Sequence, residues 1–210
     1  VIGCGVVIGE APQDLGFKGG VTRVRIGDRN VIREYSTIHR GTAEGSETVI
    51  GNDVFLMATT HVAHNCRVAD RAIVANGALL AGHVELGERA FVSGNVIVHQ
   101  FVRIGRLAMI GGGARVSKDV PPYVLVEGNS LVRAMNVIGM RRARISSEVR
   151  NRIKEAYRTL YRRGLSRDAA LARLESEADL PELREIVDFL KGSKRGVCWM
   201  RGEAGDAAAE

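Results

Sequence analysis

The chain has 210 residues and a formal net charge of +6, and its residues are 45% hydrophobic but only 5% aromatic. This composition supports a packed core of aliphatic residues, and the four prolines argue against a proline-rich disordered chain. The excess of cations suits an acidic partner, whereas the lack of interleaved aromatic residues argues against nucleic-acid binding. The sequence holds no apolar run long enough to cross a bilayer, so we expect no integral membrane contact.

A six-residue period runs from Ile2 to Val116. The residue two positions before each of the last twelve aliphatic residues is small or β-branched, and the residue after it is Gly, Ala or Ser in ten of the twelve cases. The aliphatic positions in phase are Ile2, Ile8, Ile26, Ile32, Ile38, Ile50, Leu56, Val62, Val68, Val74, Leu80, Leu86, Val92, Val98, Ile104, Ile110 and Val116. Helices and simple strands do not have this period, but a parallel β-helix does. The pattern therefore predicts a solenoid with three sides and three hexads per coil.

Two stretches keep the multiple of six but lose the aliphatic residues: residues 10–20 and 40–48. We expect both to be loops that leave the solenoid at a corner, where functional residues are common. The chain opens in mid-pattern without Met, so we expect the natural protein to begin earlier.

Five histidines fall in the repeat region. A coil of three hexads places His64, His83 and His99 near one edge of the prism, facing outward. His61 lies earlier on the same coil as His64, with the opposite side-chain direction, and His39 is predicted near a different edge. A single surface histidine usually has no function, but three along one edge favour a functional site.

A metal centre and a general base are the two chemical interpretations of this edge. A metal site needs three or four converging ligands, and carboxylates near His64 are sparse. The pair His61 and His64 also has His-x2-His spacing, whereas the zinc carbonic anhydrases of the hexapeptide fold have His-x4-His. We therefore predict no metal and favour a neutral imidazole that acts as a general base in acyl transfer to a hydroxyl.

The sequence changes character near residue 120. Three amphipathic helices are predicted: one over 146–164 capped by Ser146 or Ser147, one that starts at Ser166, and one with Pro181 in its first turn and Gly192 at its end. The predicted division is a β-helix over 1–126, a helical domain over 127–200 that covers its end, and a disordered tail over 201–210. The scattered cysteines Cys4, Cys66 and Cys198 favour a reducing compartment.

Several stretches together resemble the family of acyl-carrier-protein-dependent UDP-N-acetylglucosamine O-acyltransferases. They cover nearly the whole chain except the tail, and the order IHRGT, HVAH and VHQF is more specific than the hexad. The matching stretches are PQDLGF (12–17), TRVRIGDRNVIREYSTIHRGT (22–42), HVAHNC (61–66), LAGHVELG (80–87), VHQF (98–101), DVPPYV (119–124), GN (128–129), NVIGMRR (136–142) and KRGV (194–197).

This resemblance implies a left-handed parallel β-helix followed by a C-terminal α-helical domain, assembled as a homotrimer with active sites between subunits. It implies a cytoplasmic enzyme without cofactors that transfers a 3-hydroxyacyl chain from acyl carrier protein to the glucosamine 3-position of UDP-N-acetylglucosamine, the first step of lipid A synthesis. The acidic carrier protein would dock on the cations of "RRAR" (141–144) and of the helix that follows.

The resemblance also implies roles for individual residues. His64 matches the general base, and Gly82 matches the position whose backbone N–H holds the oxyanion. Gly112 matches the position that limits acyl-chain depth. The implied substrate-binding residues are Gln13, Asp14, His61, His83, His99, Gln100, Asn136 and Arg142.

Two positions depart from the family pattern. Asn65 stands where the family often carries Asp, and Gly16 stands where it carries Lys. Both leave open a 3-amino sugar as the acceptor. Four further functions stay open: a hexapeptide acetyltransferase that uses acetyl-CoA, the related N-acyltransferase of the same pathway, a γ-class carbonic anhydrase, and a scaffold without activity.

Overall fold

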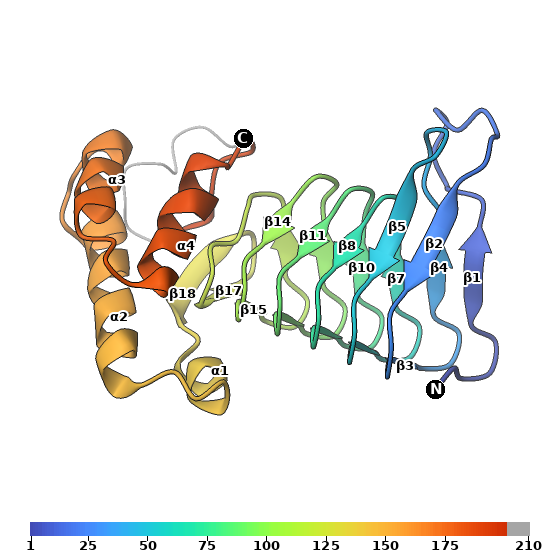
Figure 1. The fold of residues 1–210 in the computed structure, drawn as a ribbon, viewed down its shortest axis with the longest axis horizontal. Helices are drawn as coiled ribbons and strands as arrows, with labels where there is room; N and C mark the ends of the chain where they lie inside the picture. The colour runs from blue at the N-terminus through green and yellow to red at the C-terminus, as the bar shows by residue number, and fades with distance from the viewer. Residues whose placement is uncertain (201–210) are drawn as a thin grey trace.

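In the computed structural model, which describes residues 1–200, the hexads wind into a left-handed, three-sided parallel β-helix with helices at its C-terminal end (Figure 1). The predicted tail over 201–210 lies outside the described residues. The first sheet contains β1 (Val7–Glu10), β4 (Thr37–His39), β7 (His61–Val62), β10 (Leu79–Leu80), β13 (Ile97–Val98) and β16 (Arg115–Val116). The second contains β2 (Arg23–Ile26), β5 (Glu47–Ile50), β8 (Arg67–Val68), β11 (Glu85–Leu86) and β14 (Arg103–Ile104). The third contains β3 (Val31–Ile32), β6 (Phe55–Leu56), β9 (Ile73–Val74), β12 (Phe91–Val92), β15 (Met109–Ile110), β17 (Val124–Glu127), β18 (Leu131–Met135) and β19 (Trp199–Met200).

The aliphatic residue of each hexad points into the prism, as predicted. Leu56, Val62, Leu80 and Val98 are fully buried, and the small residues two positions earlier share the interior with them. From Ile32 onward, each in-phase aliphatic side chain is buried, whereas Ile2 and Ile8 in the first coil are exposed. Burial of one such side chain stabilises the coil by about 1.5–3 kcal/mol relative to an exposed side chain. The interior is too narrow for rings, which explains the low aromatic content.

Coil length depends on the two excursions. Leu79 pairs with Ile97, three hexads further along the chain, as the period predicts. Thr37 instead pairs with His61, four hexads further along, because the excursion after β4 adds one hexad. Val7 pairs with Thr37, five hexads further along, because the first excursion adds two. Both excursions leave the first corner, which we define as the turns that join the first sheet to the second.

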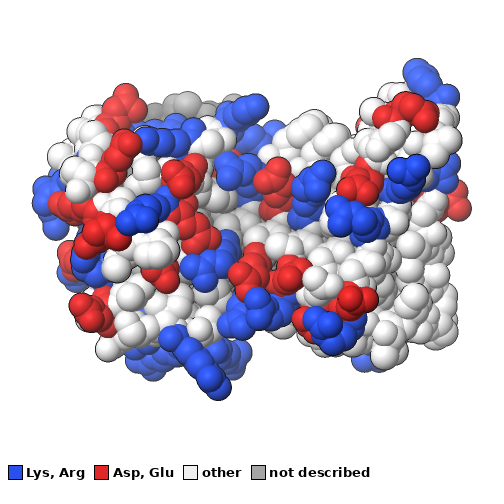
Figure 2. Space-filling model, in the orientation of Figure 1, with Lys and Arg blue, Asp and Glu red and all other residues white. Residues whose placement is uncertain are grey.

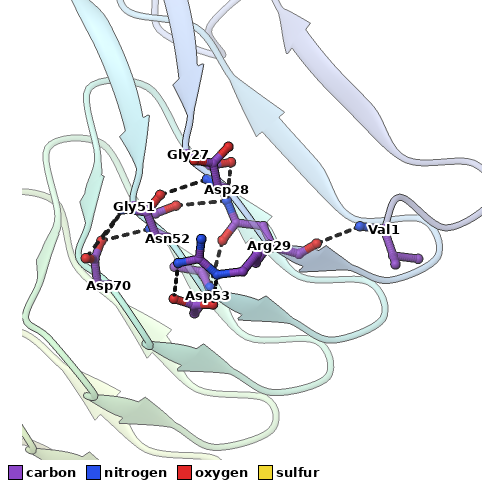
Figure 3. Close-up of polar contacts among 10 residues, drawn as sticks. Val1, Gly27, Asp28, Arg29, Gly51, Asn52, Asp53 and Asp70 are labelled. Carbon is purple, nitrogen blue, oxygen red and sulfur yellow. Dashed lines mark hydrogen bonds and ion pairs between the residues drawn. The ribbon is translucent and has the colours of Figure 1, made fainter.

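A ladder of polar side chains joins the coils at the corner between the second and third sheets (Figure 3). Asn52 Oδ1 accepts a hydrogen bond of 2.8 Å from the backbone N–H of Asp28, and Asp70 Oδ1 accepts one of 2.8 Å from the N–H of Asn52. A Cβ at Gly51 would lie 2.4 Å from Asp70 Oδ1. Small residues after each aliphatic therefore leave room for side chains that satisfy the corner N–H groups of the neighbouring coil.

The chain leaves the solenoid through a hairpin. The predicted boundary after 126 falls within β17, which forms an antiparallel hairpin with β18, so the third sheet continues to Met135. Up to residue 200, four helices follow: α1 (Val137–Arg142), α2 (Ser147–Arg162), α3 (Arg167–Ser176) and α4 (Pro181–Lys191). β19 returns to pair with β18.

The three predicted amphipathic helices are α2, α3 and α4. Ser146 and Ser166 accept hydrogen bonds from the backbone N–H groups three residues on, as N-caps do. Gly192 ends α4 as predicted. Tyr157 from α2 donates a 2.7 Å hydrogen bond to the Pro122 carbonyl, which fixes the helices over the last coil (Figure 1).

Candidate active site

The first corner carries a cluster of imidazoles. Asn65, His83 and Phe101 occupy the same position on successive coils, and each has a φ near +60°. The His64 and His83 rings meet edge to face with their centroids 5.3 Å apart, and Phe101 stacks on His83 at 4.5 Å. The structure therefore brings His64 and His83 together, as the coil arithmetic predicts.

His39 belongs to this cluster, and its predicted place near a different edge is wrong. Its ring centroid lies 4.8 Å from that of His61. The cause is the excursion that follows β4: counting in steps of three hexads misplaces His39, whereas the actual coil of four hexads pairs Ile38 with Val62 and puts His39 beside His61.

His64 is only 7% exposed, because both excursions fold over the first corner around it. Its Nδ1 lies 3.0 Å from Asn65 Oδ1. Its Nε2 lies 3.5 Å from Asp14 Oδ2, within ion-pair range but long for a hydrogen bond. The six-residue period did not place a carboxylate near His64, because Asp14 lies far from it along the chain, in an excursion without a repeat; only the family resemblance put Asp14 in the same site.

Gly82 lies one coil above His64 and faces its ring. A Cβ at this position would lie 2.3 Å from His64 Cε1 and 2.5 Å from Nε2. Within residues 1–200, the Gly82 carbonyl accepts a hydrogen bond from the Phe101 N–H, but the Gly82 N–H has no acceptor. An unpaired N–H beside an imidazole is the arrangement that acyl transfer requires for an oxyanion.

Burial favours the neutral form of His39, His61 and His83. Desolvation, followed by the neighbouring His39 and His64, lowers the pKa of His61 to about 4. Desolvation also lowers the pKa of His39 and of His83. Thr37 Oγ1 lies 2.7 Å from His61 Nδ1 and fixes that ring.

Acid is therefore expected to destabilise the fold through His61. The unfolded chain takes up a proton near pH 6.5 and the folded chain only near pH 4, so stability is complete above about 6.5 and falls as the pH drops toward 4. Because His61 is only half-buried, we discount for solvent screening and expect a loss of about 1 kcal/mol by pH 5, or about 2–4 °C in Tm.

Urea unfolding at pH 7 and pH 5 measures this loss. His61→Gln should reduce the difference between the two pH values, whereas His99→Gln, at an exposed site, should not. Equal pH dependence in His61→Gln and the parent would contradict the assignment.

His99 and Gln100 lie at the first corner, in the turn between β13 and β14 one coil above Gly82, and Gln13 lies in the first excursion. Gln13 and Gln100 are exposed, and His99 Nδ1 lies 3.2 Å from Arg195 Nη2, a contact that the sequence did not indicate. Asn136 caps α1 through a 2.9 Å hydrogen bond from the Gly139 N–H.

Three of these residues lie away from the imidazoles within one chain. Asn136 and Arg142 border a cavity of about 650 Å³ against the third sheet, with Phe91 and Met109 in its apolar wall. Gly112 lies at the corner between the third and first sheets, two residues after the end of β15. A single chain therefore does not bring Gly112, Asn136 or Arg142 to the first corner.

Charge is distributed unevenly over the molecule. Lys and Arg side chains gather around α1, whereas cations and anions alternate over the second sheet (Figure 2).

In residues 1–200, no group of three His, Cys, Asp or Glu side chains is arranged to hold a metal, and none of the helices is long and apolar enough to span a membrane.

The three-sided solenoid with imidazoles at one corner defines the class of hexapeptide-repeat acyltransferases. Residues 47–82 match the family model of bacterial transferase hexapeptide repeats, and residues 119–198 match that of domain 2 of UDP-N-acetylglucosamine O-acyltransferase. The chain belongs to the family of acyl-[acyl-carrier-protein]–UDP-N-acetylglucosamine O-acyltransferases, as its relatives demonstrate.

Relatives with this enzyme name include proteins from Gloeothece citriformis and Halorhodospira halophila. The first is 49% identical over 190 residues, which are 90% of this chain and 69% of the relative. The second is 46% identical over 196 residues, covering 90% and 75%. Among solved structures, a UDP-N-acetylglucosamine acyltransferase of Bacteroides fragilis is 44% identical with a TM-score of 0.88, covering 93% of this chain and 78% of that one. The Arabidopsis enzyme is 37% identical with a TM-score of 0.89, covering 94% and 73%.

Proposed function

We propose that this protein transfers a 3-hydroxyacyl chain from acyl carrier protein to the 3-hydroxyl of UDP-N-acetylglucosamine, the first step of lipid A synthesis, with His64 as the general base. The observation that carries the proposal is the His64 imidazole itself. One nitrogen is hydrogen-bonded to Asn65, and the other faces Asp14 and lies beside Gly82, whose N–H has no acceptor within residues 1–200. Membership of the O-acyltransferase family supports the same reaction.

The reaction proceeds by proton transfer and acyl transfer at this corner. His64 Nε2 takes the proton of the sugar hydroxyl as that oxygen attacks the thioester carbonyl. The Gly82 N–H donates a hydrogen bond to the resulting oxyanion. The intermediate collapses, the carrier thiolate leaves, and the imidazolium returns the proton to it. Asp14 stabilises the imidazolium in between, a role that Asn65 cannot fill because an amide carries no charge.

The sugar is held by groups around the base. Asp14 and Gln13 from the first excursion contact the glucosamine, and His61 and His83 contact the sugar and the acyl chain. His83 suits such contacts because burial lowers its pKa and the stacked Phe101 fixes its ring. A neutral imidazole donates a hydrogen bond at one nitrogen and accepts one at the other, whereas an imidazolium can only donate.

A homotrimer supplies the rest of the site. The outward side chains of the first sheet include Leu79 and Ile97, which are 42% and 50% exposed in one chain. The third sheet presents Phe91 and Met109 outward. The second sheet carries charges instead (Figure 2). Burying the first sheet of one subunit against the third sheet of the next hides the apolar faces and leaves the charged one in water.

In such a trimer one subunit brings its imidazoles to the neighbour's third sheet. Asn136, Arg142, His99 and Gln100 then bind the uridine and phosphates, and Gly112 lies at the end of the acyl groove. The cations around α1 attract the acidic carrier protein (Figure 2). All three cysteines are free thiols, which supports a reducing, cytoplasmic location.

Gly112 provides a test of the acyl groove. A Cβ there would lie 3.6 Å from the Gly94 carbonyl oxygen, an ordinary contact, so the fold accepts a side chain. Gly112→Met is expected to lower kcat/KM for the longest accepted donor by about 10-fold or more while sparing shorter donors. Rates with 3-hydroxyacyl carrier proteins of graded length measure this preference. If the folded variant keeps the chain-length preference of the parent, Gly112 does not line the acyl groove.

The decisive experiment compares acceptors and donors with the parent protein. Transfer from 3-hydroxyacyl carrier protein to UDP-N-acetylglucosamine is the expected activity. Preference for the 3-amino analogue would instead assign an N-acyltransferase, a function that the amide at Asn65 favours because an amine needs less help from a base. Preference for acetyl-CoA as the donor would instead assign an acetyltransferase of the hexapeptide class. The absence of any acyl transfer would refute the proposal.

A further inference from the structure

We propose that Arg40 and Glu44 are positioning residues that hold the first excursion closed over His64, so that Asp14 stays beside the base. This inference rests on the proposed function, because it assigns the two side chains on which the place of Asp14 depends. It gives the second excursion a role in the reaction that the six-residue period did not indicate.

Asp14 belongs to a tight turn within the first excursion. Its Oδ1 accepts a 2.7 Å hydrogen bond from the Gly16 N–H, and its carbonyl accepts one of 3.0 Å from the Phe17 N–H. The other carboxylate oxygen, Oδ2, is the one that lies 3.5 Å from His64 Nε2. A side chain that hydrogen-bonds the backbone two residues on stiffens the turn, so a contact that holds Phe17 also holds the carboxylate.

Arg40 holds this turn and the start of the excursion. It directly follows β4, and its backbone N–H donates a 3.2 Å hydrogen bond to the Glu10 carbonyl. Its guanidinium lies over the Phe17 ring, 5.5 Å from the centroid, within the range of a cation–π contact. Its Nη1 donates a 2.9 Å hydrogen bond to the carbonyl of Gly9, directly before the excursion. One side chain therefore joins the start of the loop to the turn that carries Asp14.

Glu44 holds the other end of the first excursion. The N–H of Val21, the first residue after it, donates a 3.0 Å hydrogen bond to Glu44 Oε2, and the Val21 carbonyl accepts one of 2.9 Å from the Gly45 N–H. A Cβ on Gly20 would lie 2.3 Å from Glu44 Oε2, so the carboxylate lies directly against the glycine backbone. The second excursion thus contacts the first at both of its ends.

The second excursion is itself tied to the solenoid. The N–H and hydroxyl of Thr42 donate hydrogen bonds of 3.1 and 2.9 Å to Asn65 on the next coil, and Thr48 at the far end is fully buried. The first excursion is more exposed, and Leu15 at its tip is 99% exposed. Loops with few buried contacts open at a low cost in free energy, so contacts with the second excursion determine how firmly the first stays closed.

Direct contact of Arg40 with a substrate phosphate is one competing explanation, and a purely structural role is the other. A direct contact acts independently of Asp14, whereas a positioning residue acts only through it. A purely structural role lowers the amount of folded protein without a selective change in KM for one substrate. Arg29 is a matched control, because its guanidinium makes two hydrogen bonds of 2.7 Å to Asp53 at a corner away from the excursions (Figure 3).

The first experiment is hydrogen–deuterium exchange of the full chain without substrate, followed by mass spectrometry of peptides that span residues 11–21. Arg40→Met and Glu44→Ala should each speed exchange there by about 10-fold or more, because each removes a hydrogen bond with a charged group. Glu44→Gln keeps an acceptor for the Val21 N–H and should stay closer to the parent. Arg29→Met should leave exchange in these residues unchanged.

The second experiment measures acyl transfer. Arg40→Met should lower kcat/KM for UDP-N-acetylglucosamine by about 10-fold, mainly through KM, and leave KM for the acyl donor within about 2-fold. The reason is that Asp14 is proposed to contact the sugar and not the donor. In an Asp14→Asn background the same substitution should cost less than about 2-fold more, because the group that it positions is already lost.

Phe17 supplies a milder test that stays available if Arg40→Met does not fold. Phe17→Leu removes the face of the ring and should reproduce part of the effect of Arg40→Met on exchange and on KM. Phe17→Tyr keeps the ring under the guanidinium and should restore both to near the parental values.

Parental exchange over residues 11–21 in folded Arg40→Met and Glu44→Ala would overturn the inference whatever the enzyme's activity. Losses that multiply in the Asp14→Asn background would assign Arg40 a direct substrate contact instead. Equal changes in Arg29→Met would indicate a structural role only. Faster exchange in both variants of a protein that shows no acyl transfer would refute only the proposed function.

Discussion

His64→Ala is expected to lower kcat for acyl transfer by about 10²- to 10⁴-fold, the range that a general base contributes. The substitution removes the proposed acceptor of the proton of the sugar hydroxyl, whose own pKa is far above neutrality. KM for the sugar nucleotide should change little, because the contacts proposed to hold it come mainly from other residues, among them Asp14 and His83. Steady-state rates at saturating donor measure the effect.

His99→Ala is the contrasting variant. His99 lies on the same solenoid and contacts Arg195 but lies outside the cluster of rings at the first corner. Its loss should raise KM for the sugar nucleotide and leave kcat within a few-fold of the parent. If correctly assembled His64→Ala keeps the kcat of the parent, His64 is not the general base.

The size of the reduction in kcat in His64→Ala depends on the acceptor. A hydroxyl needs a base to become nucleophilic, whereas a neutral amine attacks unaided and releases its proton afterwards. His64→Ala should therefore retain a larger fraction of its activity toward a 3-amino acceptor. A similar loss with both acceptors would indicate that His64 also positions the acceptor.

The sequence was sufficient for the solenoid because each hexad specifies its own inward residue and its own turn. The inward position must be aliphatic, as at Leu80 and Val98, and the chain must turn after it. The same regularity put His64 and His83 at one corner. It failed for His39, because an excursion of one hexad changes the length of that coil without interrupting the period of six.

The rest of the site depends on segments without any period. Asp14 and Thr42 lie in the two excursions, and their contacts with His64 and Asn65 arise only when these loops fold back on the corner. The C-terminal region shows the same limit. Caps and apolar faces predicted α2, α3 and α4, but α1 has only six residues and β19 forms only by pairing with β18.

Gly82→Ala is expected to fold and to lose about 10²-fold in kcat. The backbone of Gly82 lies outside the left-handed region, so alanine meets no conformational strain there. Its Cβ would lie 2.3 Å from His64 Cε1, however, closer than any real contact. The atoms in the way belong to the end of a side chain, so the ring moves and the coil remains. Misplacement of a base by about 1 Å costs roughly 10²-fold.

Gly94→Ala is the matched control, because Gly94 holds the same place in its hexad. Its Cβ would lie 3.3 Å from the Asn76 carbonyl oxygen, with no imidazole nearby, and kcat should stay near that of the parent. Circular dichroism and the ¹⁵N signals of His64 separate a displaced ring from a damaged fold. Only Gly82→Ala should move those signals, since only at Gly82 would a Cβ collide with the His64 ring. A folded Gly82→Ala with parental kcat and an unmoved ring would show that the corner relaxes by another route, and that Gly82 does not set the position of the base.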